Sequence, residues 1–226
     1  RTILFNPAYN DFPQKQGRIG YEFEHKFSDT VSFHQNLRVS TLSTDEKFGT
    51  TTYAGRVKED LDAISTDTYL KTLLRTGPIS HTVLTGLDIG RASYGSRIGY
   101  NFASISDPAL PEPTKQRQTL IGAYVQDEMK MGPWRLLLSG RHDWLSSTYT
   151  VPGTAPSKQD EGAFTGRAGL SYVTDFGLTP YVSYGTSFNP NPGTVLNGGV
   201  AKPTKGETAE AGVKYAVPGY NAFINA

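Results

Sequence analysis

Apolar and polar residues alternate with a period of two along much of the chain. The stretch from Arg18 to Phe27 shows the pattern most clearly. One face carries Ile19, Tyr21, Phe23, His25 and Phe27, and the other carries Arg18, Gly20, Glu22, Glu24 and Lys26. After the short segment Ser28–Thr30 the alternation resumes over Val31–Ser40. Because two residues is the side-chain period of a β-strand, the pattern predicts a hairpin with one apolar and one polar face.

The same unit recurs along the chain. Further pairs of strands, each joined by a short turn, are predicted. They are residues 64–76 with 80–94, 119–131 with 134–150, 163–173 with 178–188, and 207–215 with a strand that starts after the turn at Val217–Gly219. Longer connections rich in Gly, Pro, Thr, Asn and Asp are expected at about residues 43–63, 95–118, 151–162 and 187–205. Since short and long connections alternate, an up-and-down meander would gather the short turns at one end and the long loops at the other.

The predicted strands are long. Soluble strands usually have roughly 5–6 residues, whereas a tilted membrane-spanning strand needs roughly 9–11. Trp134 and Trp144 lie near the two ends of one apolar face, as in the aromatic girdles of a membrane barrel. The pattern favours an all-β, transmembrane, antiparallel up-and-down β-barrel, of which about nine or ten strands are present. A soluble β-barrel with its apolar face inside is the alternative, but it would enclose many Arg, Glu and Lys residues.

The composition narrows the function classes. Lys and Arg number 22 against 21 Asp and Glu in 226 residues, a balance that argues against a nucleic-acid-binding protein. The absence of cysteine excludes a disulfide scaffold, a Cys-ligated zinc site and a thiol nucleophile. The four histidines have no metal-ligand spacing, so no metal site or resident cofactor is expected. No nucleophile–base arrangement indicates an enzyme.

Six parts of the sequence carry motifs that bear on function: Ile19–His25, Gln35–Arg38, Gly122–Glu128 with Leu136–Trp144, Phe164–Tyr172, Tyr181–Phe188 and Pro203–Tyr215. Together they resemble TonB-dependent siderophore receptors. Gly122–Glu128 with Leu136–Trp144 is similar to that family's G-x-Y-x-Q-D … W … G-x-R-x-D hairpin, and Ile19–His25 and Gln35–Arg38 resemble strands of the ferrichrome-type subgroup. The six parts cover nearly the whole chain in the family's order.

The resemblance implies a receptor in the outer membrane of a Gram-negative bacterium. Such a receptor has an N-terminal plug domain inside a barrel of about 22 strands. It imports an Fe(III)-siderophore with energy from the TonB–ExbB–ExbD complex. On this interpretation residues 1–226 are the middle part of one barrel domain, and the plug and the C-terminal strands are absent from the chain.

Two sets of residues are candidates for function. The first set consists of charged residues that are predicted to face the lumen and contact the plug. For any single member, the simpler explanation is that it only pairs with another charge in a water-filled lumen. The set comprises Arg141, Asp143, Arg167, Glu210 and Lys214. For the second set, aromatic side chains suit the apolar and amide surface of a siderophore, although loop packing is the simpler explanation for any single member. It comprises Phe48, Tyr53, Tyr94, Tyr100, Phe102, Tyr149 and Phe188.

Two other functions compete with the receptor. A passive outer-membrane porin would have the same strand pattern but an open lumen without a plug. A soluble β-barrel used for binding or adhesion would have the same alternation with its faces exchanged. The sequence does not identify the siderophore.

Overall fold

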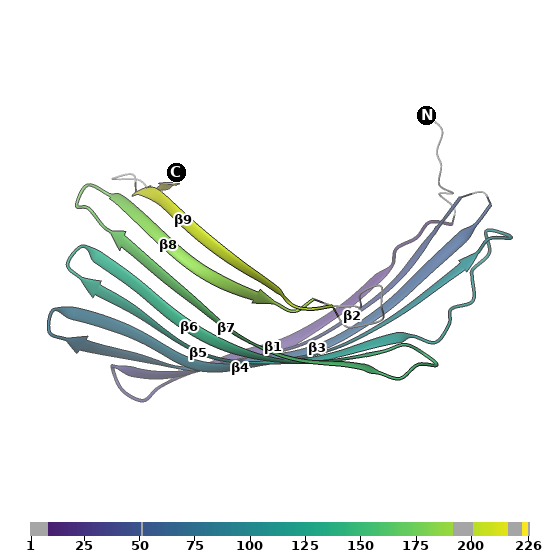
Figure 1. Cartoon of the computed structure of the whole chain (residues 1–226), viewed down its shortest axis with the longest axis horizontal. Helices are drawn as coiled ribbons and strands as arrows, with labels where there is room; N and C mark the ends of the chain where they lie inside the picture. Colours follow the sequence, from purple (N-terminus) through teal and green to yellow (C-terminus); the bar gives the residue numbers. More distant parts are fainter. Residues whose placement is uncertain (1–8, 51, 192–200, 217–222, 226) are drawn as a thin grey trace.

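The structure is a computed structural model that describes residues 9–50, 52–191, 201–216 and 223–225, and every regular element within them is a β-strand. The strands are β1 (Gln14–Lys26), β2 (Val31–Gly49), β3 (Ala54–Thr76), β4 (Ile79–Asn101), β5 (Thr114–Met131), β6 (Trp134–Thr150), β7 (Ser157–Tyr172), β8 (Leu178–Asn189), β9 (Thr204–Ala216) and β10 (Phe223–Asn225). They form one antiparallel sheet in which each strand pairs with the next. Figure 1 shows this sheet curving into a trough.

The turns at residues 27–30, 77–78, 132–133 and 173–177 lie at one end of the sheet, and the connections at 50–53, 102–113 and 151–156 lie at the other (Figure 1). The second end carries the long connections, although the one at 50–53 is itself short. This arrangement confirms the predicted up-and-down meander. Gly77, Gly132 and Gly177 have φ angles of 59°, 55° and 92°, in the left-handed region that a glycine adopts without a steric penalty. The turn expected at Val217–Gly219 lies outside the described residues.

The predicted long connections are wrong in extent. β2 and β3 stay paired up to Gly49 and Ala54, so the connection expected at 43–63 shrinks to residues 50–53. The connections expected at 95–118 and 151–162 shrink in the same way to 102–113 and 151–156. Of the connection expected at 187–205, β8 extends to Asn189 and β9 begins at Thr204, and residues 192–200 lie outside the described residues. Near these ends both faces carry polar residues, so the alternation disappears although the hydrogen-bonded ladder continues.

Each pair of strands has a continuous one-to-one register, which fixes the face of every strand residue. The faces are as predicted, because Ile19, Tyr21 and Phe23 lie on one and Glu22 and Glu24 on the other. We call the concave face the inner face and the convex face the outer face.

The outer face carries the apolar side chains. Ile19 and Phe164 remain 74% and 72% exposed, and the buried apolar residues of the described chain are only Ala54, Leu145 and Ala163. Trp134 and Trp144 both lie on this face, as predicted. An apolar convex surface with almost no core beneath it fits a sheet that faces lipid, and it contradicts the alternative of a soluble barrel with its apolar face inside.

The sheet of the described residues is open, with β1 and β10 at its two edges. No helix in the described part of the chain is long and apolar enough to cross a membrane.

Candidate functional site

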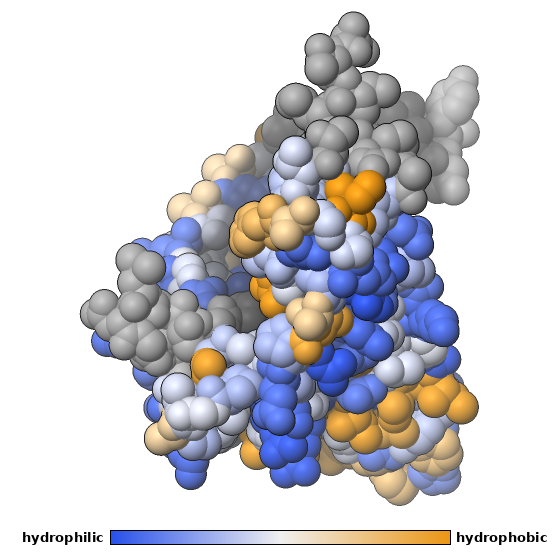
Figure 2. Space-filling view, turned by 90° about the vertical axis from the view of Figure 1, so that its right-hand side faces the viewer, coloured by the Kyte–Doolittle hydropathy of each residue, from blue (hydrophilic) through white to orange (hydrophobic). Residues whose placement is uncertain are grey.

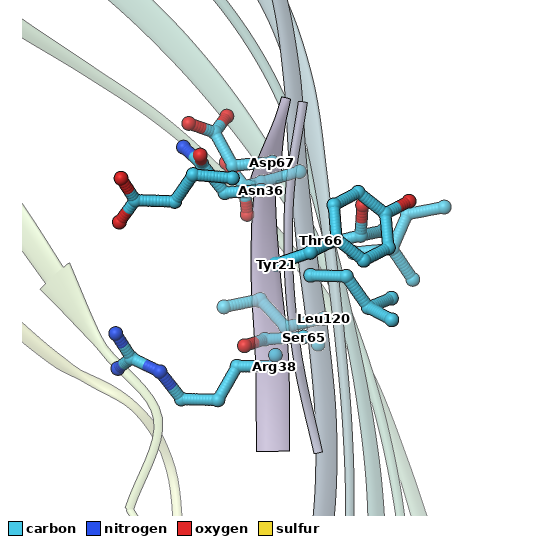
Figure 3. A pocket seen from close by; sticks show the side chains of 13 residues that line it. Tyr21, Asn36, Arg38, Ser65, Thr66, Asp67 and Leu120 are labelled. Carbon is cyan, nitrogen blue, oxygen red and sulfur yellow. The ribbon is translucent and has the colours of Figure 1, made fainter. Parts of the chain in front are cut away.

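The inner face is a polar wall. Figure 3 shows Asn36, Arg38 and Asp67 pointing into the trough, whereas Tyr21 and Thr66 point away from it. Together with residues of β1, β4 and β5, the inward side chains line a hollow of about 700 Å³. The wall is therefore built for contact with water or with polar groups.

Arg141 on β6 is the centre of a carboxylate network on this wall. Its Nε lies 2.9 Å from both oxygens of Asp143, and its Nη2 donates to Asp143 Oδ1 at 2.6 Å. The same guanidinium pairs with Asp88 on β4, with Nη2 3.0 Å from Asp88 Oδ1. One cation thus serves two carboxylates, so the group keeps a net negative charge.

Two glycines allow the side chain of a residue on one strand to pass over the neighbouring strand and contact the strand beyond it. Gly122 lies between Asp88 and Asp143 in register, and Arg141 passes over it to reach Asp88. Gly86 lies beneath the ring of Tyr124, whose hydroxyl donates to Asp67 Oδ1 at 2.8 Å. In both places a side chain crosses a whole strand because the residue beneath it has no β-carbon.

The other predicted lumen residues gather nearer the short turns. Glu210 on β9 accepts a hydrogen bond from the Tyr181 hydroxyl at 2.5 Å, and the Lys214 ammonium lies 5.1 Å from the centre of the Tyr181 ring. Arg167 lines the same hollow of about 670 Å³. All five predicted lumen residues thus lie on the inner face, in two groups, one around Arg141 and one around Tyr181.

Four of the seven aromatic candidates form one group at the end that carries the long connections. Tyr100 contacts Phe48 edge-on at 6.3 Å between ring centres and stacks on Phe102 at 5.7 Å, and Phe102 lies 6.3 Å from Tyr53. The Phe48 ring packs over Gly55, where a β-carbon would be 2.5 Å from it. Figure 2, which looks onto this end, shows a largely hydrophilic surface interrupted by small apolar patches.

Tyr94 and Tyr149 lie deeper on the inner face, on either side of Gln116. The Tyr94 hydroxyl donates to Glu59, which holds the tyrosine against the wall. Gln116 is buried and donates to the Ser147 hydroxyl at 3.3 Å. These residues form a second, hydrogen-bonding part of the wall below the aromatic group.

Phe188 does not join the other aromatic candidates. It pairs with Lys205 in a register that places both on the outer face, whereas Phe48, Tyr94, Tyr100 and Tyr149 lie on the inner face. The grouping of Phe188 with the other aromatic candidates is therefore wrong, because the alternation along β8 turns Phe188 to the same face as Val182 and Tyr184.

The connection between β4 and β5 is pinned to the outer face. Asp107 accepts one hydrogen bond from the Lys47 ammonium at 2.8 Å and lies 3.5 Å from an Arg56 nitrogen. Arg56 also donates two hydrogen bonds to Asp45, at 2.7 and 2.6 Å. The cations lower the pKa of both aspartates, the carboxylates raise those of Lys47 and Arg56, and hydrogen bonding is the largest cause in each case.

The same connection is folded internally. The Asn101 amide donates to Ser104 and Ser106 at 3.0 Å and accepts from the Ala103 amide at 3.0 Å. Because the connection begins with Phe102, its anchoring also fixes one member of the aromatic group.

The sequence did not predict Asp88, Tyr124, Glu59 or Asp107. Pairs of residues on two strands joined by a short turn could have been predicted, because the turn sets the register. The Gly132–Pro133 turn, for example, places Gly122 opposite Asp143. Contacts across the longer connections offered no such signal.

The whole chain, residues 1–226, matches the family model "TonB dependent receptor-like, beta-barrel". The chain belongs to this family. Among curated relatives, the ferrichrome outer membrane transporter/phage receptor of Escherichia coli K12 is 32% identical over 258 residues, covering 91% of the chain and 34% of the relative. The ferrioxamine B receptor of Salmonella typhimurium LT2 is 32% identical over 245 residues, covering 96% and 34%. The chain thus spans about a third of the length of these relatives.

Solved structures show the same fold. The ferric citrate transporter FecA in its unliganded form matches with a TM-score of 0.77 and 16% identity, over 92% of this chain and 33% of that one. The ferric preacinetobactin receptor BauA of Acinetobacter baumannii matches with a TM-score of 0.78 and 18% identity, over 95% and 37%. The resemblance to TonB-dependent receptors that was inferred from the motifs is confirmed by the family model.

Proposed function

We propose that the chain forms the middle of the barrel wall of an outer-membrane receptor that imports a ferric siderophore. The observation that carries the proposal is the family match over all 226 residues. Two curated relatives more than 30% identical, a ferrichrome transporter and a ferrioxamine B receptor, support the class of ligand. Energy would come from the TonB–ExbB–ExbD complex through a plug domain outside this chain. The protein would be a transporter and not an enzyme.

Within the receptor, the aromatic group at the long-connection end is proposed to contact the siderophore. Phe48, Tyr53, Tyr100 and Phe102 are held together by ring contacts and present apolar and π surface to the mouth of the barrel. Rigid aromatic surface suits a bulky ligand with apolar and amide groups.

The plug is proposed to contact the inner wall lower down. The net negative network around Arg141 and the group around Tyr181 offer charged hydrogen bonds that a polar domain inside the barrel can form and exchange. Arg141, Asp143, Arg167, Glu210 and Lys214 keep this proposed role.

The test uses the complete receptor in detergent, titrated with a panel of Fe(III)-siderophores while Trp and Tyr fluorescence is followed. Saturable quenching by a ferric siderophore, absent with its iron-free form, is expected. Phe102→Ala should weaken this binding about tenfold, whereas Tyr184→Ala on the outer face should leave it unchanged.

The two alternatives give different results. A porin would bind no siderophore and would conduct small solutes and ions through an open lumen. A soluble binding module would stay dispersed without detergent. The family match favours the receptor over both.

A further inference from the structure

The inner face is cationic at the end of the sheet that carries the short turns. We define the lower segments as the eight residues of each of β1–β9 next to this end, and the lower wall as their inner face. They are residues 19–26, 31–38, 69–76, 79–86, 124–131, 134–141, 165–172, 178–185 and 209–216. Every Lys and Arg of these segments lies on the lower wall. The only ionised group on their outer face apart from histidine is Asp127, which lies 2.7 Å from His81.

Most cations of the lower wall have no anionic partner. Arg141 holds its two aspartates, the Lys130 ammonium lies 3.0 Å from a Glu128 oxygen, and Arg135 donates to two carbonyl oxygens of the adjacent turn. The other six have no ion pair among the residues that the structure describes, and none of them is buried. They are Lys26, Arg38, Lys71, Arg75, Arg167 and Lys214.

Carboxylates at this end are fewer than cations. They are Glu22, Glu24, Glu128 and Glu210 on the wall, and Asp29 and Asp175 in the short turns. The lower wall therefore keeps a net positive charge. Figure 3 shows one of its cations, Arg38, reaching into the trough.

Cations of the wall also stand close to one another. Lys130 and Arg135 are direct partners in the β5–β6 register, and Arg75 lies in the same row with only Ser80 between it and Lys130. Like charges at directly opposed positions destabilise a sheet. An anionic partner on the wall would offset this repulsion.

The width of the lower wall indicates which kind of anion it fits. Its cations lie on strands from β1 to β9, which at about 4.8 Å per strand is a spread of roughly 40 Å. A small anion contacts only a few of them at once. Lipid headgroups lie against the outer face, where the lower segments have no Lys or Arg. The wall fits a broad acidic protein surface inside the barrel.

We infer that the lower wall binds an acidic face of the plug domain, whose Asp and Glu side chains form charge-assisted hydrogen bonds with the six unpaired cations. The inference rests on the proposed function, which places a plug inside the barrel, and it adds the sign of the plug's charge and its position. The carboxylate network around Arg141 lies further from the short turns and is net negative, so the acidic face belongs below it. Because salt screens contacts between exposed charges, the plug should be held less firmly at high salt.

The experiment compares the complete receptor with the double charge reversal Lys26→Glu with Arg75→Glu, since both side chains are exposed and unpaired within the described chain. The control, Lys115→Glu with Lys158→Glu, changes the net charge by the same amount on the outer face at the opposite end. Amide hydrogen exchange of the plug and ion conductance of planar bilayers that contain the receptor are measured at low and high salt. The variant Lys26→Gln with Arg75→Gln removes the two charges without adding repulsion.

The plug of the wild-type receptor and of the control should exchange slowly at low salt and faster at high salt. The double reversal should speed plug exchange about three- to tenfold at low salt and raise the conductance, and the glutamine variant should do so by a smaller factor. Wild-type exchange in both test variants, or an equal rise in the control, would overturn the inference while the proposed function stands. The fluorescence titration of the wild-type receptor tests that function separately, and if no ferric siderophore binds there, the proposed function fails.

Discussion

Gly122 lies directly beneath the guanidinium of Arg141, and a β-carbon at this glycine would come within 2.0 Å of the Arg141 Nη2. The missing side chain is what lets Arg141 cross β5 and pair with Asp88 as well as with Asp143. The glycine on β5 thus allows one guanidinium to bind a carboxylate on β4 and a carboxylate on β6.

Gly122→Ala should push the Arg141 guanidinium aside and break its pair with Asp88. The loss of a charged hydrogen bond on the partly exposed wall should cost about 1–2 kcal/mol of stability in the complete receptor. Urea unfolding in detergent or lipid measures this cost. Gly90→Ala is the matched control, because Gly90 lies on the inner face of β4 with no atom within 4 Å of the added carbon. Equal effects of the two substitutions would contradict the assigned role of Gly122.

Tyr124→Phe should leave Asp67 without the hydrogen bond that it accepts at 2.8 Å. The ring still fits over Gly86, so the change isolates the hydroxyl, and a loss of about 0.5–1.5 kcal/mol is expected. The comparison is Tyr172→Phe, since the Tyr172 hydroxyl has no hydrogen-bond partner within the described part of the chain. A Tyr124 variant as stable as the Tyr172 variant would show that the bond contributes nothing.

Asp107→Asn should loosen the connection between β4 and β5, because the neutral amide weakens the pairs with Lys47 and Arg56. Faster amide hydrogen exchange is expected over residues 102–113 but not over the β3–β4 ladder. Glu112→Gln removes a charge from the same connection without breaking an ion pair of the described structure, and should leave exchange unchanged.

The anchoring of this connection should depend on pH at both extremes. The depressed pKa values of Asp45 and Asp107 mean that their contribution is full above their ordinary value of 3.8, and is lost as the pH falls below it through the lower folded values. The raised pKa of Lys47 means that its contribution is full below 10.5 and is lost as the pH rises through the higher folded value. Proteolysis of the connection should therefore stay slow between these limits. Rapid cleavage at pH 5 would contradict the assignment.

The sequence predicted some elements closely and others poorly, for a physical reason. Residues 134–150 form a strand with the predicted bounds, because alternation and a tight Gly-Pro turn both act locally. The pairing of Asp88 with Arg141 was not predictable, because it depends on the β4–β5 register, which a twelve-residue connection leaves open in the sequence. Arg141, Asp143, Arg167, Glu210 and Lys214 could be assigned to one face because they lie on the polar side of strands with clear alternation. Glu59 and Asp107 were missed because they lie where both faces are polar.

The unbroken one-to-one registers also limit how this chain can change in evolution. A single residue inserted into the middle of β3 would move every side chain between the insertion and Ala54, at the long-connection end, to the opposite face of the sheet. Arg56 and Lys58 would then enter the mouth, and Glu59 would turn outward. Unless a β-bulge absorbs the extra residue, length changes within a strand must therefore come in pairs of residues, whereas the connections can gain or lose any number. Relatives that bind differently charged ligands are expected to differ by substitution in their strands and by length only in their loops.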